Sequence, residues 1–272
     1  MRSISLLGGH VESYKILRLC GLMLMAPFLG TALGQETGIA ARYPGDGGIE
    51  KDPAVIFSEN FEEPSLSSVI SRWTSSSNDS GMSLPTDVPL ASSGKHSLLV
   101  TSINGVNTGG RLYKRFNPGY DLLYLRYYVK YAPPPGYYDH TGGRLAGCSE
   151  PTGTCGGHSG ERPLGNDMFT TGAEPNYEYK QPSTGVRMDF YTYWMGMRLG
   201  TSGVYYGNTF VHDPNVKVDY GQWTCVEIMV KVNDPITSSN GEQALWLNGK
   251  EIVHLGPGFP KGKWIGGNDF QP

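Results

Sequence analysis

Residues 121–131 have the sequence DLLYLRYYVKY, in which apolar and amphipathic side chains alternate without a break. Successive side chains of a β-strand point to opposite faces, so this alternation predicts a strand with two different faces. One face suits a core and carries Leu123, Leu125, Tyr127, Val129 and Tyr131. The other face is amphipathic and carries Leu122, Tyr124, Arg126, Tyr128 and Lys130.

The rest of the chain also favours strands over helices. Aromatic strands are predicted at residues 186–194 and 204–211, and residues 223–255 predict a three-stranded meander whose last turn is Asn248-Gly249. The chain of 272 residues is rich in glycine (38), proline (19) and tyrosine (17), and only 17% of its residues are charged. This composition predicts an all-β sandwich or barrel.

The first 34 residues predict a secretory signal peptide. Lys15 and Arg18 precede an apolar run at 19–29 that is too short to span a bilayer. Ala32 and Gly34 then form a small-residue cleavage pattern. We therefore expect a secreted protein, extracellular or periplasmic, with no membrane anchor after signal cleavage.

The sequence beyond the signal peptide divides into two parts. Residues 35–53 have little to bury and contain two turn signals, Pro44-Gly45 and Asp46-Gly47, so they predict a leader that lies over the domain. Residues 54–272 are expected to form a single domain. The formal net charge of the chain is −3, which argues against a nucleic-acid partner, because binding nucleic acid requires a basic surface.

Several motifs carry a family resemblance. FSENFEE (57–63), SGKHSLLV (93–100) and GQWTCVEIMVKVN…NGEQALWLNGKEI (221–252) resemble the concanavalin A-like jelly-roll superfamily of lectins, glucanases and polysaccharide lyases. The order YLRYYVKY…GGRLAG…GQWTCVEIMVKVN…NGEQALWLNGK is similar to alginate and glucuronan lyases of the family-14 type. The resemblance covers residues 54–255 and implies a jelly-roll β-sandwich of two antiparallel sheets.

Two departures from the family pattern matter. Those lyases tend to have Gly-Gly-Lys where this chain has Gly142-Gly143-Arg144, and an arginine cannot give up its proton to act as a base. The chain also stops at KGKWIGGNDFQP (261–272), where such folds usually add at least one more strand. The expected jelly roll is therefore compatible with a missing last strand.

The resemblance implies an extracellular polysaccharide as the partner and, in its sharper form, a lyase that cleaves an acidic uronate polymer by β-elimination. That reaction needs a group that neutralises the carboxylate, a base and an acid. The candidate catalytic residues are Arg144, His140, Tyr191 and Tyr193. The candidate substrate-binding residues are Tyr124, Arg126, Tyr128, Arg187 and Asn208.

A non-catalytic, lectin-like carbohydrate-binding module is the alternative. Aromatic rings interleaved with arginine and asparagine can stack on sugar rings and bind hydroxyls without any chemistry. A glucanase is disfavoured, because we find no strand with the paired carboxylates that retaining hydrolysis needs. The acidic cluster of Glu59, Glu62 and Glu63 predicts either a solvated surface or a calcium ligand. No cofactor is required for either function, and calcium stays possible.

The glycine-rich stretch HTGGRLAGCSEPTGTCGGHSG, residues 140–160, contains two cysteines. With Cys20 removed in the signal peptide, the preferred disulfide is Cys148–Cys155, and pairing with Cys225 is the alternative. A zinc site has suitable donors but lacks the short Cys-x-x-Cys spacing; its ligands would be His140, Cys148, Cys155 and His158. We interpret the stretch as a disulfide-braced lip over the concave face of a sheet, with Arg144 and His140 directed at the ligand.

Overall fold

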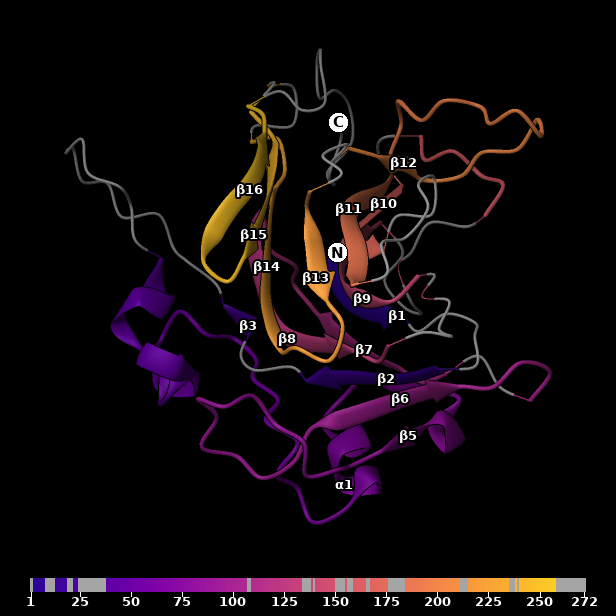
Figure 1. Ribbon diagram of the computed structural model, residues 1–272. Coiled ribbons are helices and arrows are strands. Elements are labelled where there is room, and N and C mark those ends of the chain that lie inside the picture. Colours follow the sequence, from indigo (N-terminus) through magenta and orange to yellow (C-terminus); the bar gives the residue numbers. More distant parts are fainter. Residues whose placement is uncertain are drawn as a thin grey trace.

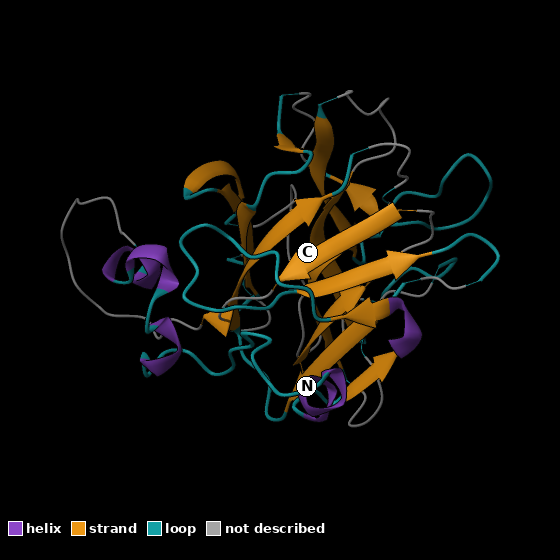
Figure 2. Cartoon of the chain, turned by 60° about the horizontal axis from the view of Figure 1, so that its bottom comes forward, coloured by secondary structure: helices purple, strands orange, loops and turns teal. Residues whose placement is uncertain are grey.

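The computed structural model describes N-terminal strands at residues 2–7, 13–18 and 22–23, and the chain from residue 38 to 257. Within the second range it leaves out residues 107–108, 134–137, 139, 150–154, 156–158, 165–166, 176–183, 211–214, 235–237 and 239. The described chain forms two antiparallel sheets with short helices at the margins (Figure 1, Figure 2). The predicted all-β sandwich is thereby confirmed.

The first sheet, here called sheet A, carries most of the candidate catalytic residues. Its strands, in spatial order, are β12 (Asn208–Thr209), β11 (Gly185–Tyr193), β10 (Met168–Pro175), β9 (Gly142–Cys148), β1 (Arg2–Leu7), β7 (Arg111–Phe116) and β4 (Ser75–Ser77). A further strand, β13 (Lys217–Asp219), also pairs with β11.

The second sheet, here called sheet B, contains the strand with the alternating pattern. Its spatial order is β16 (Lys250–Leu255), β15 (Glu242–Leu247), β14 (Thr224–Lys231), β8 (Leu122–Tyr131), β2 (Ser13–Arg18), β6 (Leu98–Ser102) and β5 (Met82–Ser83), and β3 (Leu22–Met23) pairs with β8. The meander predicted at residues 223–255 is confirmed as β14, β15 and β16. Asn248 and Gly249 both have positive φ, as the tight turn between β15 and β16 requires.

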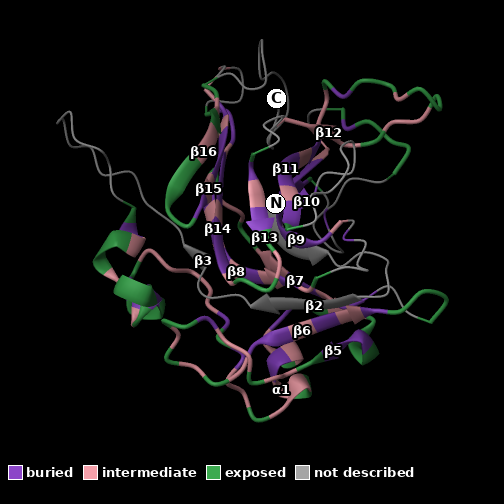
Figure 3. Ribbon diagram, in the orientation of Figure 1, coloured by how far each residue is buried: buried purple, intermediate pink, exposed green. Residues whose placement is uncertain are grey.

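The core lies between the two sheets. Along β8 the buried positions alternate with half-buried ones, as the sequence predicted. The inward side chains of β8 pack with Leu145, Met188 and Phe190 of sheet A in one hydrophobic cluster. Figure 3 colours many positions along the strands of both sheets as buried. Because β8 puts one face into this core, its other face, with Tyr124, Arg126 and Tyr128, lies on the outside of sheet B.

One predicted strand is much shorter than expected. Of residues 204–211, only Asn208 and Thr209 pair with β11. Residues 200–204 instead close a tight turn, in which the Gly200 N–H donates to the carbonyl of Val204 and the Gly203 N–H donates to that of Gly200. After this turn, Tyr205 forms only isolated bridges to Leu199 and Gly160 within the described chain, so the extended pairing begins at Asn208.

The helices are short. In the part of the chain that the structure describes, they are α1 (Leu66–Ser71) and four 3-10 helices, η1 (Ile39–Arg42), η2 (Pro44–Asp46), η3 (Ile49–Lys51) and η4 (Asp79–Gly81). Ser65 caps α1, because its hydroxyl accepts the Ser68 N–H at 3.1 Å. No helix among the described residues is long and apolar enough to cross a bilayer.

The segment from residue 38 to 55 lies against the outer face of sheet B. Ile39 and Ile49 are buried in a small apolar cluster that includes Tyr124 of β8. Asp46 accepts hydrogen bonds from the Arg126 Nε at 3.0 and 3.1 Å. The leader predicted at 35–53 therefore packs on sheet B where it is described, and residues 35–37 lie outside the described residues.

The strands at residues 2–18 fall within the predicted signal peptide. Strand β1 pairs with β7 and β9, and β2 pairs with β6 and β8, so each is an internal strand of its sheet. Cleavage after Gly34 would take one internal strand from each sheet. The signal peptide stays a prediction. A chain cleaved after Gly34 would not contain β1 and β2, so cleavage and these strand pairings exclude each other. The C-terminal residues 261–272, where a missing strand was considered, lie outside the described residues.

We expect a chain that begins at residue 35 to unfold at a lower urea concentration than the full-length chain. This shorter chain lacks β1, which pairs with β7 and β9, and β2, which pairs with β6 and β8. Ile4→Pro and Ile16→Pro, which each remove one ladder hydrogen bond, should lower the midpoint less. Tryptophan fluorescence during urea unfolding gives the midpoint of each of the four chains, which are the full-length chain, the chain from residue 35 and the two proline variants. Equal midpoints would show that these pairings do not stabilise the fold and would favour cleavage.

Candidate functional site

Sheet A brings the candidate catalytic residues together in cross-strand register. Arg144 of β9 lies opposite Gly172 of β10, and Gly172 lies opposite Tyr191 of β11. Tyr193 follows on the same face of β11, two residues along, while Leu145 and Phe190 point into the core. The predicted catalytic side chains of β9 and β11 therefore share the outer face of sheet A.

Gly172 makes this arrangement possible. A Cβ atom at this position would lie 2.5 Å from Cγ of Arg144 and 2.7 Å from the carbonyl oxygen of Gly143. The missing side chain leaves the space that the aliphatic part of Arg144 occupies. Arg144 can thus reach across β10 until its guanidinium carbon lies 5.4 Å from the centre of the Tyr191 ring.

Arg144 forms a buried ion pair with Glu174 of β10 through Nη2 and Oε2. Both side chains are only 5% exposed. The Arg144 Nε is also buried, and it has no hydrogen-bond partner within the described chain. A buried arginine charge is tolerated only when a carboxylate compensates it, so Glu174 keeps Arg144 in place.

His140 completes the cluster from the loop before β9. Its Nδ1 lies 3.0 Å from Nη2 of Arg144 and 3.2 Å from Oε1 of Glu174. These two contacts require different tautomers, because the guanidinium can only donate and the carboxylate can only accept. When Nδ1 carries the proton and donates to Glu174, Nε2 is left with a lone pair and can act as a base.

The Tyr191 hydroxyl lies beside this group. It accepts the Gly207 N–H at 3.0 Å and lies 3.3 Å from the Tyr193 hydroxyl, and the rings of His140 and Tyr191 are 5.1 Å apart between centres. Burial raises the pKa of Tyr191 well above its usual value, because a phenolate would lose its hydration. Tyr191 therefore carries its proton at neutral pH, and its raised pKa makes it a weaker acid than a free tyrosine.

Three further arginines lie on the same face of the sheet as the cluster. Arg111 and Arg115 come from β7, and Arg187 comes from β11. Tyr113 lies between the two β7 arginines and opposite Ser5 of β1, and Ser5 in turn lies opposite Arg144 of β9. The outward side chains of β7 therefore belong to the same surface as the cluster. The site thus combines a histidine, two tyrosine hydroxyls and several cationic groups.

Asn208 has a structural contact beside the site. Its side-chain oxygen accepts a hydrogen bond from Nε1 of Trp194 at 3.1 Å. This contact fixes the loop that follows β11. In the neighbouring strand β12, Thr209 lies opposite Tyr191. Arg187 and Asn208, both predicted to bind substrate, therefore lie on the same sheet as the catalytic candidates.

The remaining predicted binding residues lie elsewhere. Tyr124, Arg126 and Tyr128 are on the outer face of sheet B, whereas the cluster is on the outer face of sheet A. Arg126 pairs with Asp46 and, at 3.3 Å, with Glu227, and its side chain is 13% exposed. These three residues hold the leader on the sandwich and do not join the catalytic candidates.

The predicted disulfide between Cys148 and Cys155 is present. The Cys155 N–H donates to the Tyr113 hydroxyl at 3.1 Å, so the bridge lies over the outer face of sheet A. Because both thiols are bonded to each other, they are not available as zinc ligands, and Cys225 is buried on β14. His158, the other proposed zinc ligand, lies outside the described residues.

The acidic cluster considered for calcium is occupied by protein groups. Glu59 accepts hydrogen bonds from the Phe61 N–H, Arg72 and Trp73, and Glu62 accepts the N–H groups of Lys95 and His96. Within the described chain, no group of three or more histidine, cysteine, aspartate or glutamate residues is placed to hold a metal ion.

Sequence reasoning missed Glu174 and Gly172. Both lie in MFTTGAEP (168–175), a segment of small and polar residues that gave no strand prediction. Its alternation is weak because Thr171 on the inward face is polar and bonds to Thr192 and Gln243. The signal that could have predicted this strand is the alternation of inward Phe169 and Ala173 with outward Gly172 and Glu174.

Comparison of the chain with protein-family models, with curated proteins and with solved structures gave no match.

We expect Glu174→Gln to lower the free energy of unfolding by about 3–5 kcal/mol, because it leaves the buried Arg144 charge uncompensated. Urea unfolding measures the loss. Asp219→Asn is the matched control, since Asp219 is 57% exposed and pairs with Lys217 at the surface. It should change stability by less than about 1 kcal/mol. Equal small losses would contradict a stabilising role for the Arg144–Glu174 pair.

Proposed function

We propose that this protein is a polysaccharide lyase-like protein that acts on an acidic uronate polymer by β-elimination on the outer face of sheet A. The observation that carries the proposal is the convergence of His140, Arg144, Tyr191 and Tyr193 around Glu174. The motif resemblance to concanavalin A-like lyases supports the same conclusion, as does the two-sheet sandwich.

In the proposed reaction His140 is the base and Tyr191 is the acid. His140 Nε2 takes the proton from the carbon next to the carboxylate, and the electron pair forms the carbon–carbon double bond as the glycosidic carbon–oxygen bond breaks. The Tyr191 hydroxyl protonates the leaving oxygen. Glu174 supports this assignment, because accepting the Nδ1 proton sets the tautomer in which Nε2 is the base. Tyr193 hydrogen-bonds to Tyr191 and positions its hydroxyl.

Arg144 is the candidate to neutralise the substrate carboxylate. A guanidinium carries five N–H donors, and the contacts with Glu174 and His140 both use Nη2. A uronate carboxylate that enters beside the half-exposed His140 would share Arg144 with Glu174. Withdrawal of negative charge from that carboxylate acidifies the adjacent carbon, which is the first requirement of β-elimination.

The polymer is proposed to be acidic because Arg111, Arg115 and Arg187 lie on the same face. Arginine matches a carboxylate with a two-pronged donor set, so repeated uronates would find successive partners. The base, acid and cation are all side chains, so the proposed chemistry requires no cofactor, calcium included. The Cys148–Cys155 disulfide supports action in an oxidising compartment, which agrees with the proposed export.

We expect full-length protein to release unsaturated uronate, followed by ultraviolet absorbance, from alginate or glucuronan and not from a neutral glucan. Tyr191→Phe removes only the proton-donating hydroxyl and should lower turnover about 100-fold or more, with little change in polymer affinity. His140→Gln should lower turnover similarly. Tyr124→Phe is the control, since Tyr124 lies on sheet B and should leave turnover unchanged.

A lectin-like binding module is the second candidate, and the Arg144–Glu174 pair favours it, because an arginine already bound to a carboxylate is a weaker neutralising group. Retained binding of an immobilised acidic polymer without product release would establish that function. No binding and no product release, with a folded protein, would overturn both candidates.

A further inference from the structure

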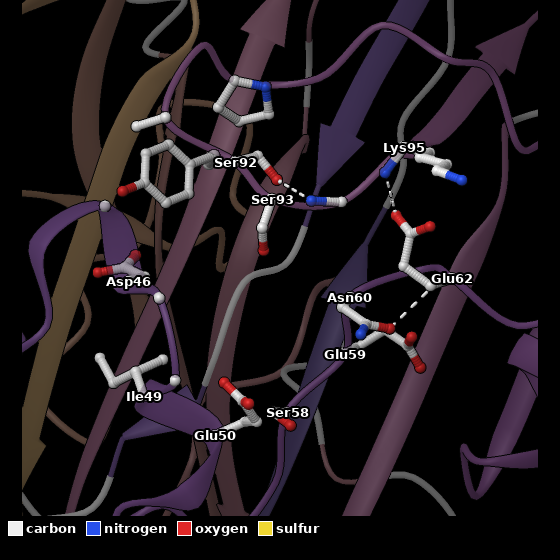
Figure 4. A pocket seen from close by; sticks show the side chains of 17 residues that line it. Asp46, Ile49, Glu50, Ser58, Glu59, Asn60, Glu62, Ser92, Ser93 and Lys95 are labelled. Atoms are coloured by element: carbon white, nitrogen blue, oxygen red, sulfur yellow. Dashed lines mark hydrogen bonds between the residues drawn. The ribbon is translucent and has the colours of Figure 1, made fainter.

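The outer face of sheet B carries a cavity of about 350 Å³ that the proposed function does not use. Its walls come from the leader at 45–50, the segment at 58–62, the loop at 89–95 and Tyr128 of β8 (Figure 4). The cavity lies outside sheet B, whereas the His140 cluster lies outside sheet A, so the core of the sandwich separates the two sites.

The walls are fixed by contacts behind the cavity. Asp46 is bound to Arg126, and Glu62 accepts the N–H groups of Lys95 and His96. The leader also touches the loop directly, since a Cβ atom on Gly45 would lie 3.1 Å from the Ala91 carbonyl oxygen. The three wall segments therefore keep their positions without a ligand, and a pre-formed cavity costs little ordering free energy on binding.

The charged residues that line the cavity are mostly acidic. Carboxylates are contributed by Asp46, Glu50, Glu59 and Glu62, and Lys95 is the basic residue of the lining. Hydroxyls are contributed by Ser58, Ser92 and Ser93, and the Ser93 side chain points toward the open middle of the cavity (Figure 4). Glu50 is exposed and Glu62 is partly exposed, so uronates, phosphates and other anions would meet a like charge there.

A neutral sugar fits this chemistry. Its hydroxyls donate to carboxylate and serine oxygens, and its apolar ring face can lie on an aromatic ring such as Tyr128. The volume is near the lower end of the range for small-molecule pockets, about 300–1,000 Å³, so it suits a short stretch of sugar units. A bare cation fits less well, because Asp46, Glu59 and Glu62 already accept hydrogen bonds from protein donors.

We propose that the cavity between the leader and the 89–95 loop is a binding site for a neutral glycan, separate from the site for the acidic polymer. The protein then engages two kinds of sugar on opposite faces of its sandwich. This proposal does not depend on catalysis on sheet A, because none of the lining residues belongs to the His140 cluster.

Isothermal titration of full-length protein with cellohexaose, mannohexaose and laminarihexaose tests the proposal, and a mannuronate hexamer is the acidic comparison. We expect one neutral hexamer to bind. Ser93→Trp places a large side chain in the cavity and should weaken that binding at least about tenfold. Leu90→Trp is the matched control, because Leu90 lies on the same loop, is fully exposed and does not line the cavity.

A second variant tests the proposal without a bulky substitution, because Ser93→Trp could lose binding simply by misfolding the loop. Glu50→Gln removes a charge from an exposed lining residue and should weaken binding of the neutral hexamer by about threefold to tenfold. Binding of the mannuronate hexamer should be the same in all variants, which separates this proposal from the one for sheet A. Absence of neutral-sugar binding, or equal binding in Ser93→Trp and Leu90→Trp, would overturn the proposal.

Discussion

The structure depends on the packing of the apolar face of β8 against sheet A. Tyr127 and Leu125 of β8 are completely buried in the cluster that includes Leu145 and Phe190. Since a strand alternates its side chains, fixing this face inward fixes the other face outward. The same rule acts on β9, β10 and β11 of sheet A, so each sheet presents a second surface, and both candidate sites lie on these outer surfaces.

Cross-strand register then decides which outward residues meet. Arg144, Gly172 and Tyr191 lie in one row across three strands, and a shift of one residue in any strand would turn its side chain into the core. The row also explains why a buried charge is tolerated. Gly172 gives Arg144 a path across β10, and Glu174 on the same face supplies the compensating carboxylate. The register is therefore what joins the folding of sheet A to the chemistry proposed for it.

Local patterns predicted the parts of this protein that depend on alternation and turn chemistry. The β8 strand, the hairpin at Asn248-Gly249 and the Cys148–Cys155 bridge follow from short stretches of sequence. The candidates His140, Arg144, Tyr191 and Tyr193 lie next to one another in the structure, and their catalytic role stays a prediction. Alternation shows that a strand has two faces, but it does not show which sheet the strand joins. Arg126 was grouped with Arg144 for that reason, although their strands lie in different sheets. Glu174 was missed because its role comes from its position beside Arg144, which only pairing of β9 with β10 creates.

The leader explains why sheet B does not share the charge of sheet A. Without residues 38–55, Arg126 would present a cation on the outer face of β8. Asp46 of the leader binds that cation, and the same aspartate lines the cavity, so one contact removes a positive site from the wall of the cavity. Glu227 on β14 lies opposite Arg126 and completes the compensation. Because charge selects against the wrong ligand as well as for the right one, the proposed acidic polymer would be directed toward the arginines of sheet A, and the proposed neutral sugar toward the cavity under the leader.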